Sequence, residues 1–251
     1  MGLYLRSMYH HSNRSPRYPR PVPTRSTQDI DVILSADLIV STDHMNQIRD
    51  VLDELGYNAT TKYFQFERPI GDKQHTVEVD LLAAPPHPQK EKAVKVKGPR
   101  IRPLDSENIH ARLSEEAEAV DRDSISINLS KPAARLDIDL DNPTVYIPSS
   151  FNYLILKLHA FSDRNDDQQA DQGRHHAMDI FTTVTDMSKM DWRNAEQHFE
   201  DECDKPYLQE AINIQQQYFA KKNDLGIIRI RESQTYQRHQ KEFDSYIPNV
   251  I

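Results

Sequence analysis

Cysteine, glycine and long apolar runs are scarce in this chain of 251 residues. Cys203 is the single cysteine, so no disulfide can form within the chain, which suits a reducing cytoplasm. It lacks a His or Asp framework and is expected to be a packing residue. The six glycines form no G-x-G-x-x-G or Walker A loop, which argues against Rossmann and P-loop nucleotide sites.

Apolar runs fall short of the roughly 18 residues that a membrane helix needs, and the N-terminus lacks the apolar segment of a secretory signal. We therefore expect a cytoplasmic protein with no membrane partner. A net charge of −8 argues against a generally basic coat for nucleic acid. Positive charge is nevertheless concentrated in two blocks, before Asp29 and at 90–102. Solvated loops or tails are the usual explanation of such blocks, and a nearby anionic ligand is the alternative.

Hydrophobic patterning predicts a mixed α/β protein. Residues 1–24 have four prolines and no hydrophobic period, and are expected to form a disordered or extended basic arm. Thr42 or Asp43 is expected to cap the first helix, and Gly56 to end it. The elements expected next are a strand at 29–34, a helix from 42 to 55, a strand at 57–67, a turn at 72–73 and a strand at 75–83.

The later part of the chain changes character after Pro148. The Pro- and Lys-rich segment 85–103 is predicted to be a loop or linker, and 107–120 to be helical. Short strands are predicted at 124–129 and 144–147, and helices at 149–164, 174–187, 191–202 and 206–222. These patterns predict a core of mixed sheet and flanking helices at 25–147, followed by a helical C-terminal region at 148–251.

Two acidic pairs lie in the predicted strands, and each has a single residue between its carboxylates. Asp29 and Asp31 would project on one face of their strand, with Ile30 and Val32 turned toward the core. The segment Glu78-Val79-Asp80 repeats this pattern. If the strands are neighbours, three or four carboxylates converge, and Mg²⁺ would remove their mutual repulsion. A lone D-x-D is more often a water-facing strand end, but the second acidic strand favours a metal site.

These segments resemble the DNA polymerase β-type nucleotidyltransferase superfamily, and within it most closely the AbiEii/AbiGii-type toxin group. The resemblance covers roughly residues 25–187 and depends on the combination of motifs. The matching segments are RSTQDIDV at 25–32, VEVDLL at 77–82, LKLHA at 156–160, Asp163-Arg164 and RHHAMDI at 174–180.

The resemblance implies transfer of a nucleoside monophosphate from an NTP to a hydroxyl acceptor, with two Mg²⁺ ions. Asp29, Asp31 and Asp80 would be the catalytic and metal-binding residues. Lys157 and Arg164 would bind the triphosphate. Arg25 and Thr27, within the first motif, are further nucleotide-binding candidates. The acceptor could be tRNA or a protein, and a cognate antitoxin could be a partner.

One element of the family pattern is missing, namely a Gly-Gly or Gly-Ser turn ahead of the acidic pair that holds phosphate at a helix start. Only Gly2 precedes Asp29. Either the chain lacks its true beginning or the phosphate loop has been lost. Two alternatives to an active nucleotidyltransferase therefore stay open: a catalytically impaired binding or toxin–antitoxin module with the same fold, and a carboxylate-metal nuclease.

The segment 175–179 offers a second metal-ligand spacing, through His175, His176 and Asp179. It lacks the H-E-x-x-H arrangement of a zinc protease. The simpler interpretation is that the histidines are partly exposed and that Asp179 caps or pairs with Arg174 or Arg164.

Overall fold

The computed structural model describes residues 29–71, 75–130, 144–168, 171–241 and 244. The basic arm predicted at 1–24 and the turn predicted at 72–73 lie outside these ranges. The chain separates into two compact units, one ending at Asp121 and the other beginning at Arg122, whereas the sequence analysis had placed the boundary after Ile147. As predicted, the fold is mixed α/β, a mixed sheet with flanking helices followed by a helical region.

The first unit is built around a sheet in which β4 is the central strand. β4 (His75–Ala83) pairs in parallel with β1 (Asp29–Leu34) and antiparallel with β3 (Gln65–Ile70). The sheet continues from β4 through β7 (Ala111–Leu113) and β6 (Arg100–Pro103) to β5 (Val94–Lys97), and β2 (Asn58–Ala59) extends it beyond β3.

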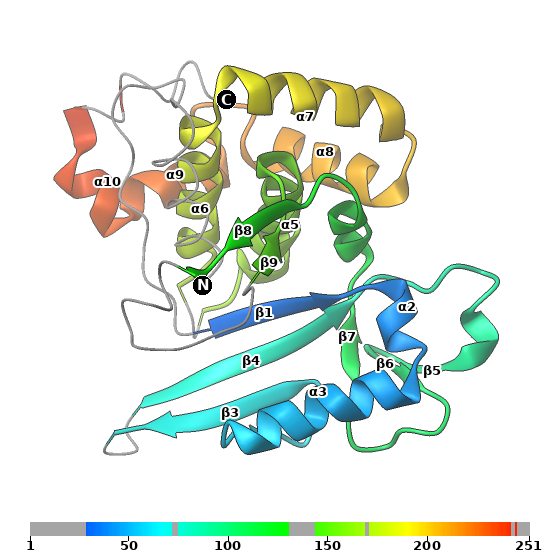
Figure 1. Cartoon of the computed structure of the whole chain (residues 1–251). Helices are drawn as coiled ribbons and strands as arrows, with labels where there is room; N and C mark the ends of the chain where they lie inside the picture. The colour runs from blue at the N-terminus through cyan, green and yellow to red at the C-terminus, as the bar shows by residue number, and fades with distance from the viewer. Residues whose placement is uncertain (1–28, 72–74, 131–143, 169–170, 242–243, 245–251) are drawn as a thin grey trace. The chain divides into compact units, whose positions relative to one another are not determined.

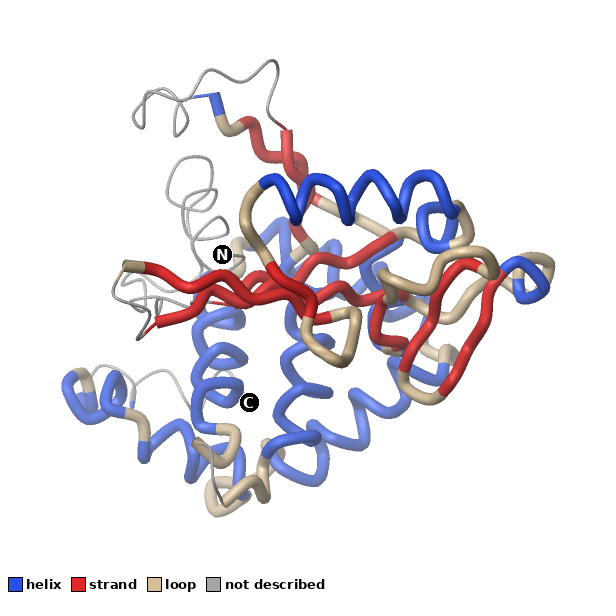
Figure 2. Tube along the Cα trace, turned by 90° about the horizontal axis from the view of Figure 1, so that it is seen from below, coloured by secondary structure: helices blue, strands red, loops and turns tan. Residues whose placement is uncertain are grey.

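The helices α2 (Ala36–Ile39) and α3 (Thr42–Glu54) connect β1 to the next strands. Figure 1 shows α3 alongside β3 and β4, and Figure 2 shows the same layer from below with the strands in red. Met45 and Leu52 of α3 are buried with Phe66, Val79 and Leu81 of the sheet in one apolar core. The alternation of β4 therefore places its apolar residues in this core and Glu78 and Asp80 on the opposite face.

The start of α3 corrects one prediction. Ser41, and not Thr42 or Asp43, is the N-cap, because its hydroxyl accepts the backbone N–H of His44 at 3.3 Å. The predicted end of the helix is confirmed, since Gly56 follows the C-cap with a φ of +77°, a left-handed conformation that glycine adopts without strain.

Four other local predictions are wrong in whole or in part. The strand predicted over 57–67 is interrupted by a turn in which Tyr63 has a φ of +58°. The segment 85–103, predicted as a loop, contains the antiparallel pair β5–β6, preceded by a short 3-10 helix, η1 (Glu91–Ala93). The segment 107–120, predicted as helical, contains β7 and a second 3-10 helix, η2 (Glu115–Asp121). Val32, expected in the core, is 37% exposed.

The second unit contains the predicted short strands, β8 (Ile125–Asn128) and β9 (Thr144–Ile147), which pair only with each other among the described strands. The four predicted helices are present to within a few residues at their ends. They are α5 (Ser150–Arg164), α6 (Arg174–Asp186), α7 (Lys189–Glu202) and α8 (Pro206–Tyr218), and they are followed by α9 (Leu225–Glu232) and α10 (Gln234–Arg238).

Helix α6 is buried continuously from Ala177 to Asp186, although its sequence is rich in threonine. The hydroxyls of Thr182 and Thr183 donate to the carbonyls of Met178 and Asp179 at 2.8 and 2.7 Å. These bonds within the helix satisfy the hydroxyls and allow polar residues to be buried. No helix in the described ranges combines the length and the apolar character needed to cross a bilayer.

Candidate functional site

The two acidic strands are direct neighbours in the first unit. In the parallel β1–β4 ladder, Asp31 is paired with Asp80 and Asp29 with Glu78. Residues paired across a ladder project from the same face of a sheet. The four carboxylates therefore share the face of the sheet opposite the apolar core. We call them the acidic patch.

The surroundings of Asp80 disfavour its charged form. Burial raises the pKa of Asp80, and the nearby carboxylates of Asp31 and Glu78 raise it further. Lys62 and a hydrogen bond from Gln65 act on this pKa in the opposite direction. Its Oδ1 atom is buried and has no hydrogen-bond partner among the described residues. Such a buried, unpaired oxygen among like charges favours either a proton or a cation.

Lys62 and Gln65 were not found from the sequence. Gln65 is paired with Asp80 across β3 and β4, and its Nε2 donates to Glu78 Oε2 at 3.2 Å. Lys62 donates through Nζ to Gln65 Oε1 at 3.1 Å. Lys62 is brought to this position by the turn at Tyr63, for which the sequence gives no glycine or proline signal.

Magnesium fits the acidic patch by ligand chemistry. Among the described residues, no three His, Cys, Asp or Glu side chains are gathered closely enough to hold one metal ion. Mg²⁺ does not require such a set, because it is commonly held by one or two carboxylates together with substrate phosphates and water. Asp31 and Asp80, adjacent across the ladder, are oxygen ligands of the required kind.

The basic candidates of the second unit are less available than the sequence indicates. Lys157 Nζ lies 3.5 Å from Asp179 Oδ2, and their side chains are only 14% and 3% exposed. Asp179 therefore pairs with Lys157, not with Arg174 or Arg164 as the simpler interpretation had it. Arg164, the last residue of α5, is exposed. Arg25 and Thr27 lie outside the described residues.

The histidine segment and Cys203 have local explanations. His175 contacts Asp171, with its Nδ1 at 2.7 Å from Oδ2 and its backbone N–H donating to the same oxygen. This contact places His175 at the start of α6 as an exposed side chain. Cys203 was expected to be a packing residue, but it is exposed, because it is the C-cap of α7.

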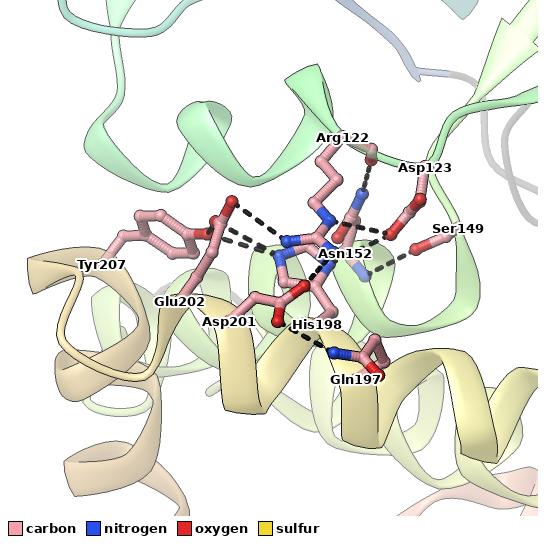
Figure 3. A network of polar contacts seen from close by, with 9 residues as sticks. All are labelled: Arg122, Asp123, Ser149, Asn152, Gln197, His198, Asp201, Glu202 and Tyr207. Carbon is pink, nitrogen blue, oxygen red and sulfur yellow. Dashed lines mark hydrogen bonds and ion pairs between the residues drawn. The ribbon is translucent and has the colours of Figure 1, made fainter.

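A separate polar network joins three segments of the second unit (Figure 3). Arg122 contacts Asp201 at 2.5 Å and Glu202 at 3.5 Å, both at the end of α7. Glu202 also accepts a hydrogen bond from the hydroxyl of Tyr207 in α8. His198, only 1% exposed, lies 3.4 Å from Glu202. The network holds the chain before β8 against α7 and α8.

A scan against family models, a search of curated proteins and a search of solved structures each find no match. The functional assignment therefore depends on the fold and on the chemistry of the acidic patch.

Proposed function

We propose that this protein is a Mg²⁺-dependent nucleotidyltransferase that moves a nucleoside monophosphate from an NTP to a hydroxyl acceptor. The proposal depends mainly on one observation, the side-by-side placement of Asp31 and Asp80 on neighbouring parallel strands. The resemblance of these strands to the polymerase β-type superfamily, and to its AbiEii/AbiGii-type toxins, points the same way.

The acidic patch supplies what this reaction needs from a protein. The resemblance makes Asp29, Asp31 and Asp80 the Mg²⁺ ligands; of these, Asp31 and Asp80 are adjacent across the β1–β4 ladder and would hold the ion together with substrate phosphates and water. The metal, when bound, neutralises charge on the phosphates and aligns the reacting oxygens. The resemblance also implies that Asp80 would help to activate the acceptor hydroxyl, accepting its proton as that hydroxyl attacks the α-phosphate. The α–β phosphate bond then breaks and pyrophosphate leaves.

Lys62 is close enough to influence Asp80, so it is positioned to balance the charge of the triphosphate. Lys157 and Arg164 stay candidates for the same task. Binding of triphosphate by Lys157 would require it to exchange its partner Asp179 for a phosphate oxygen.

Transfer of label from an α-labelled NTP tests the proposal directly. The protein would be incubated with each NTP, Mg²⁺ and total RNA or protein, and the label followed into either fraction. Asp31→Asn should lower transfer by roughly 100-fold or more, the scale for removing a group that stabilises transition-state charge. Asp50→Asn, an exposed residue of α3 away from the patch, is the matched control and should retain transfer. Equal activity of the two variants would reject the proposal.

A second candidate is a catalytically impaired binding module of the same fold, such as one partner of a toxin–antitoxin pair. The Lys157–Asp179 ion pair favours it, because it engages the lysine expected to bind triphosphate. Calorimetry distinguishes the two candidates. An active enzyme should bind a non-hydrolysable NTP in the presence of Mg²⁺, and an impaired module should not.

The acceptor and a partner follow from the same resemblance. We propose tRNA or a protein as the acceptor, a cognate antitoxin as a partner, and, from the composition, the cytoplasm as the location. The single cysteine supports a reducing compartment. Separating the labelled products into RNA and protein identifies the acceptor class.

A further inference from the structure

The sheet face that carries the acidic patch also carries a group of cations. In the β4–β7 ladder Leu82 is paired with Arg112, and in β6–β7 Arg100 is paired with Arg112. Leu82 and Asp80 are two residues apart in β4 and therefore share a face. The β5–β6 register adds Lys97 opposite Arg100 and Lys95 opposite Arg102. Pairing thus places every one of these cations on the face of Asp80.

Four of these cations, all but Arg112, line a groove of about 520 Å³ on the β5–β6 hairpin. Its walls include Lys95, Lys97, Arg100 and Arg102, and Glu107 is its single acidic residue. The groove is therefore strongly positive on a protein whose net charge is −8. A concentrated positive surface on an acidic protein selects for an anionic ligand at that place.

The cations of the groove differ in whether their charge is already used in contacts within the protein. Arg102 is used by the protein itself, since its Nη1 donates to the carbonyls of Pro103 and Leu104 at 3.0 and 2.9 Å and its Nη2 lies 3.7 Å from Glu107. Among the described residues, Lys95, Lys97 and Arg100 form no ion pair. Their charges are therefore available to a ligand.

An aromatic pair includes one residue of the groove wall. His110 lines the groove, and its ring lies 5.4 Å from that of Tyr63, centroid to centroid. Tyr63 is 39% exposed. The Nδ1 atom of His110 is buried and has no hydrogen-bond partner among the described residues. Burial lowers the pKa of His110, and Arg102 and Arg100 lower it further, so the imidazole is neutral at pH 7 and suited to stacking.

We propose that this groove binds a single-stranded nucleic acid, with Lys95, Lys97 and Arg100 on its phosphates and the Tyr63–His110 pair stacking on a base. Cations that follow a backbone beside an aromatic ring are the usual means of binding single strands. A free inorganic phosphate would use the cations alone. The proposal does not depend on nucleotidyl transfer and would hold for an inactive protein.

Fluorescence anisotropy with a labelled oligouridylate, an oligodeoxyuridylate and a duplex of the same length tests the charge contribution. Replacing Lys95, Lys97 and Arg100 with glutamine should weaken single-strand binding by roughly tenfold or more at low salt. The slope of log affinity against log salt should become shallower by about 2, the expectation for three lost phosphate contacts. The RNA and DNA probes show whether the 2′-hydroxyl contributes.

The matched control removes three exposed cations of the second unit, in the variant Lys189→Gln, Arg193→Gln, Lys222→Gln. It changes the net charge equally and should bind as the unsubstituted protein does. The proposal is overturned if both triple variants weaken binding equally, if neither does, or if the duplex binds as tightly as the single strands.

A second pair of variants tests stacking without changing charge. Tyr63→Asn removes the ring and tolerates the left-handed backbone at this position, so the turn should be retained. It should lower affinity several-fold, in line with about 1 kcal/mol per stacked base, and leave the salt slope unchanged. Tyr63→Phe should bind as the unsubstituted protein does. Equal binding by all three proteins would contradict the stacking contact.

Discussion

At the scale of single residues, Asp80 shows how a site can oppose the stability of its own fold. Its ionised form is disfavoured by burial and by two neighbouring carboxylates. The folded protein therefore binds a proton at Asp80 more tightly than the unfolded chain does. The proton bound at Asp80 therefore stabilises the folded protein below the unfolded pKa, near 3.8. This stabilisation is lost as the pH rises through the elevated pKa of Asp80 in the folded protein.

Asp80→Asn should accordingly raise the melting temperature of the metal-free protein at neutral pH while abolishing nucleotidyl transfer. The gain should shrink as the pH falls toward 3.8, where the native carboxyl also becomes neutral. Thermal melts of both proteins across this range measure it. Asp50→Asn should not raise the melting temperature comparably. A rise in the melting temperature of Asp80→Asn that persisted in acid would contradict the explanation.

The carboxylates were predictable from the sequence because alternation in a strand places every second residue on one face. Lys62 and Gln65 were not, since their position depends on a turn whose left-handed residue is a tyrosine. The Lys157–Asp179 pair was also missed. Spacing along a helix shows which residues share a face but not which neighbouring helix provides the counterion.

At the scale of elements, α3 and α9 (Leu225–Glu232) give tests of local packing and capping. Ser41→Ala should destabilise the protein by about 1 kcal/mol, the usual loss for an N-cap, as measured by urea denaturation. Asp43→Ala, at a position expected from the sequence to be a cap, should cost clearly less. The reverse order would contradict the observed start of the helix.

Gly226 in α9 is in contact with an aromatic ring. A Cβ atom at this position would lie 2.3 Å from Phe219 Cε1. Gly226→Ala should therefore destabilise the protein by about 1–3 kcal/mol in urea denaturation, although alanine favours a helix over glycine by about 1 kcal/mol. Adding Phe219→Leu should restore part of the loss. A stabilised Gly226→Ala variant would show that the ring moves aside easily.

The β5–β6 hairpin was not predicted, because it also depends on contacts between segments that the local sequence does not show. Its strands, VKVK and RIRP, alternate as strands do, but their lysines and prolines also fit a polar loop. Pairing with β7 decides the outcome, and that pairing is not visible in the local sequence.

At the scale of the whole molecule, the first compact unit ends at Asp121, before the boundary expected after Ile147. The strands β8 and β9 were identified correctly, but local patterning does not show that they pair with each other and not with the main sheet. The fold class was predictable because it depends on the sum of many elements, whereas the boundary depends on which strands pair.

If the acidic patch holds Mg²⁺, the ion should stabilise the two units unequally. Hydrogen exchange followed by mass spectrometry should show that Mg²⁺ slows exchange in β1 and β4 and leaves α7 and α8 unchanged. Asp31→Asn should remove this protection. Slower exchange spread evenly over both units would point to a general ionic effect.

Strand β1 pairs only with β4 among the described strands. Its outer edge therefore presents backbone groups that could template a strand from another molecule. Charged side chains on such an edge disfavour pairing with a strand of another molecule, so Asp29 and Asp31 also oppose self-association. Neutralising both residues to obtain an inactive enzyme would remove this charge repulsion at the edge of β1. The double variant should therefore aggregate more readily on storage than either single variant.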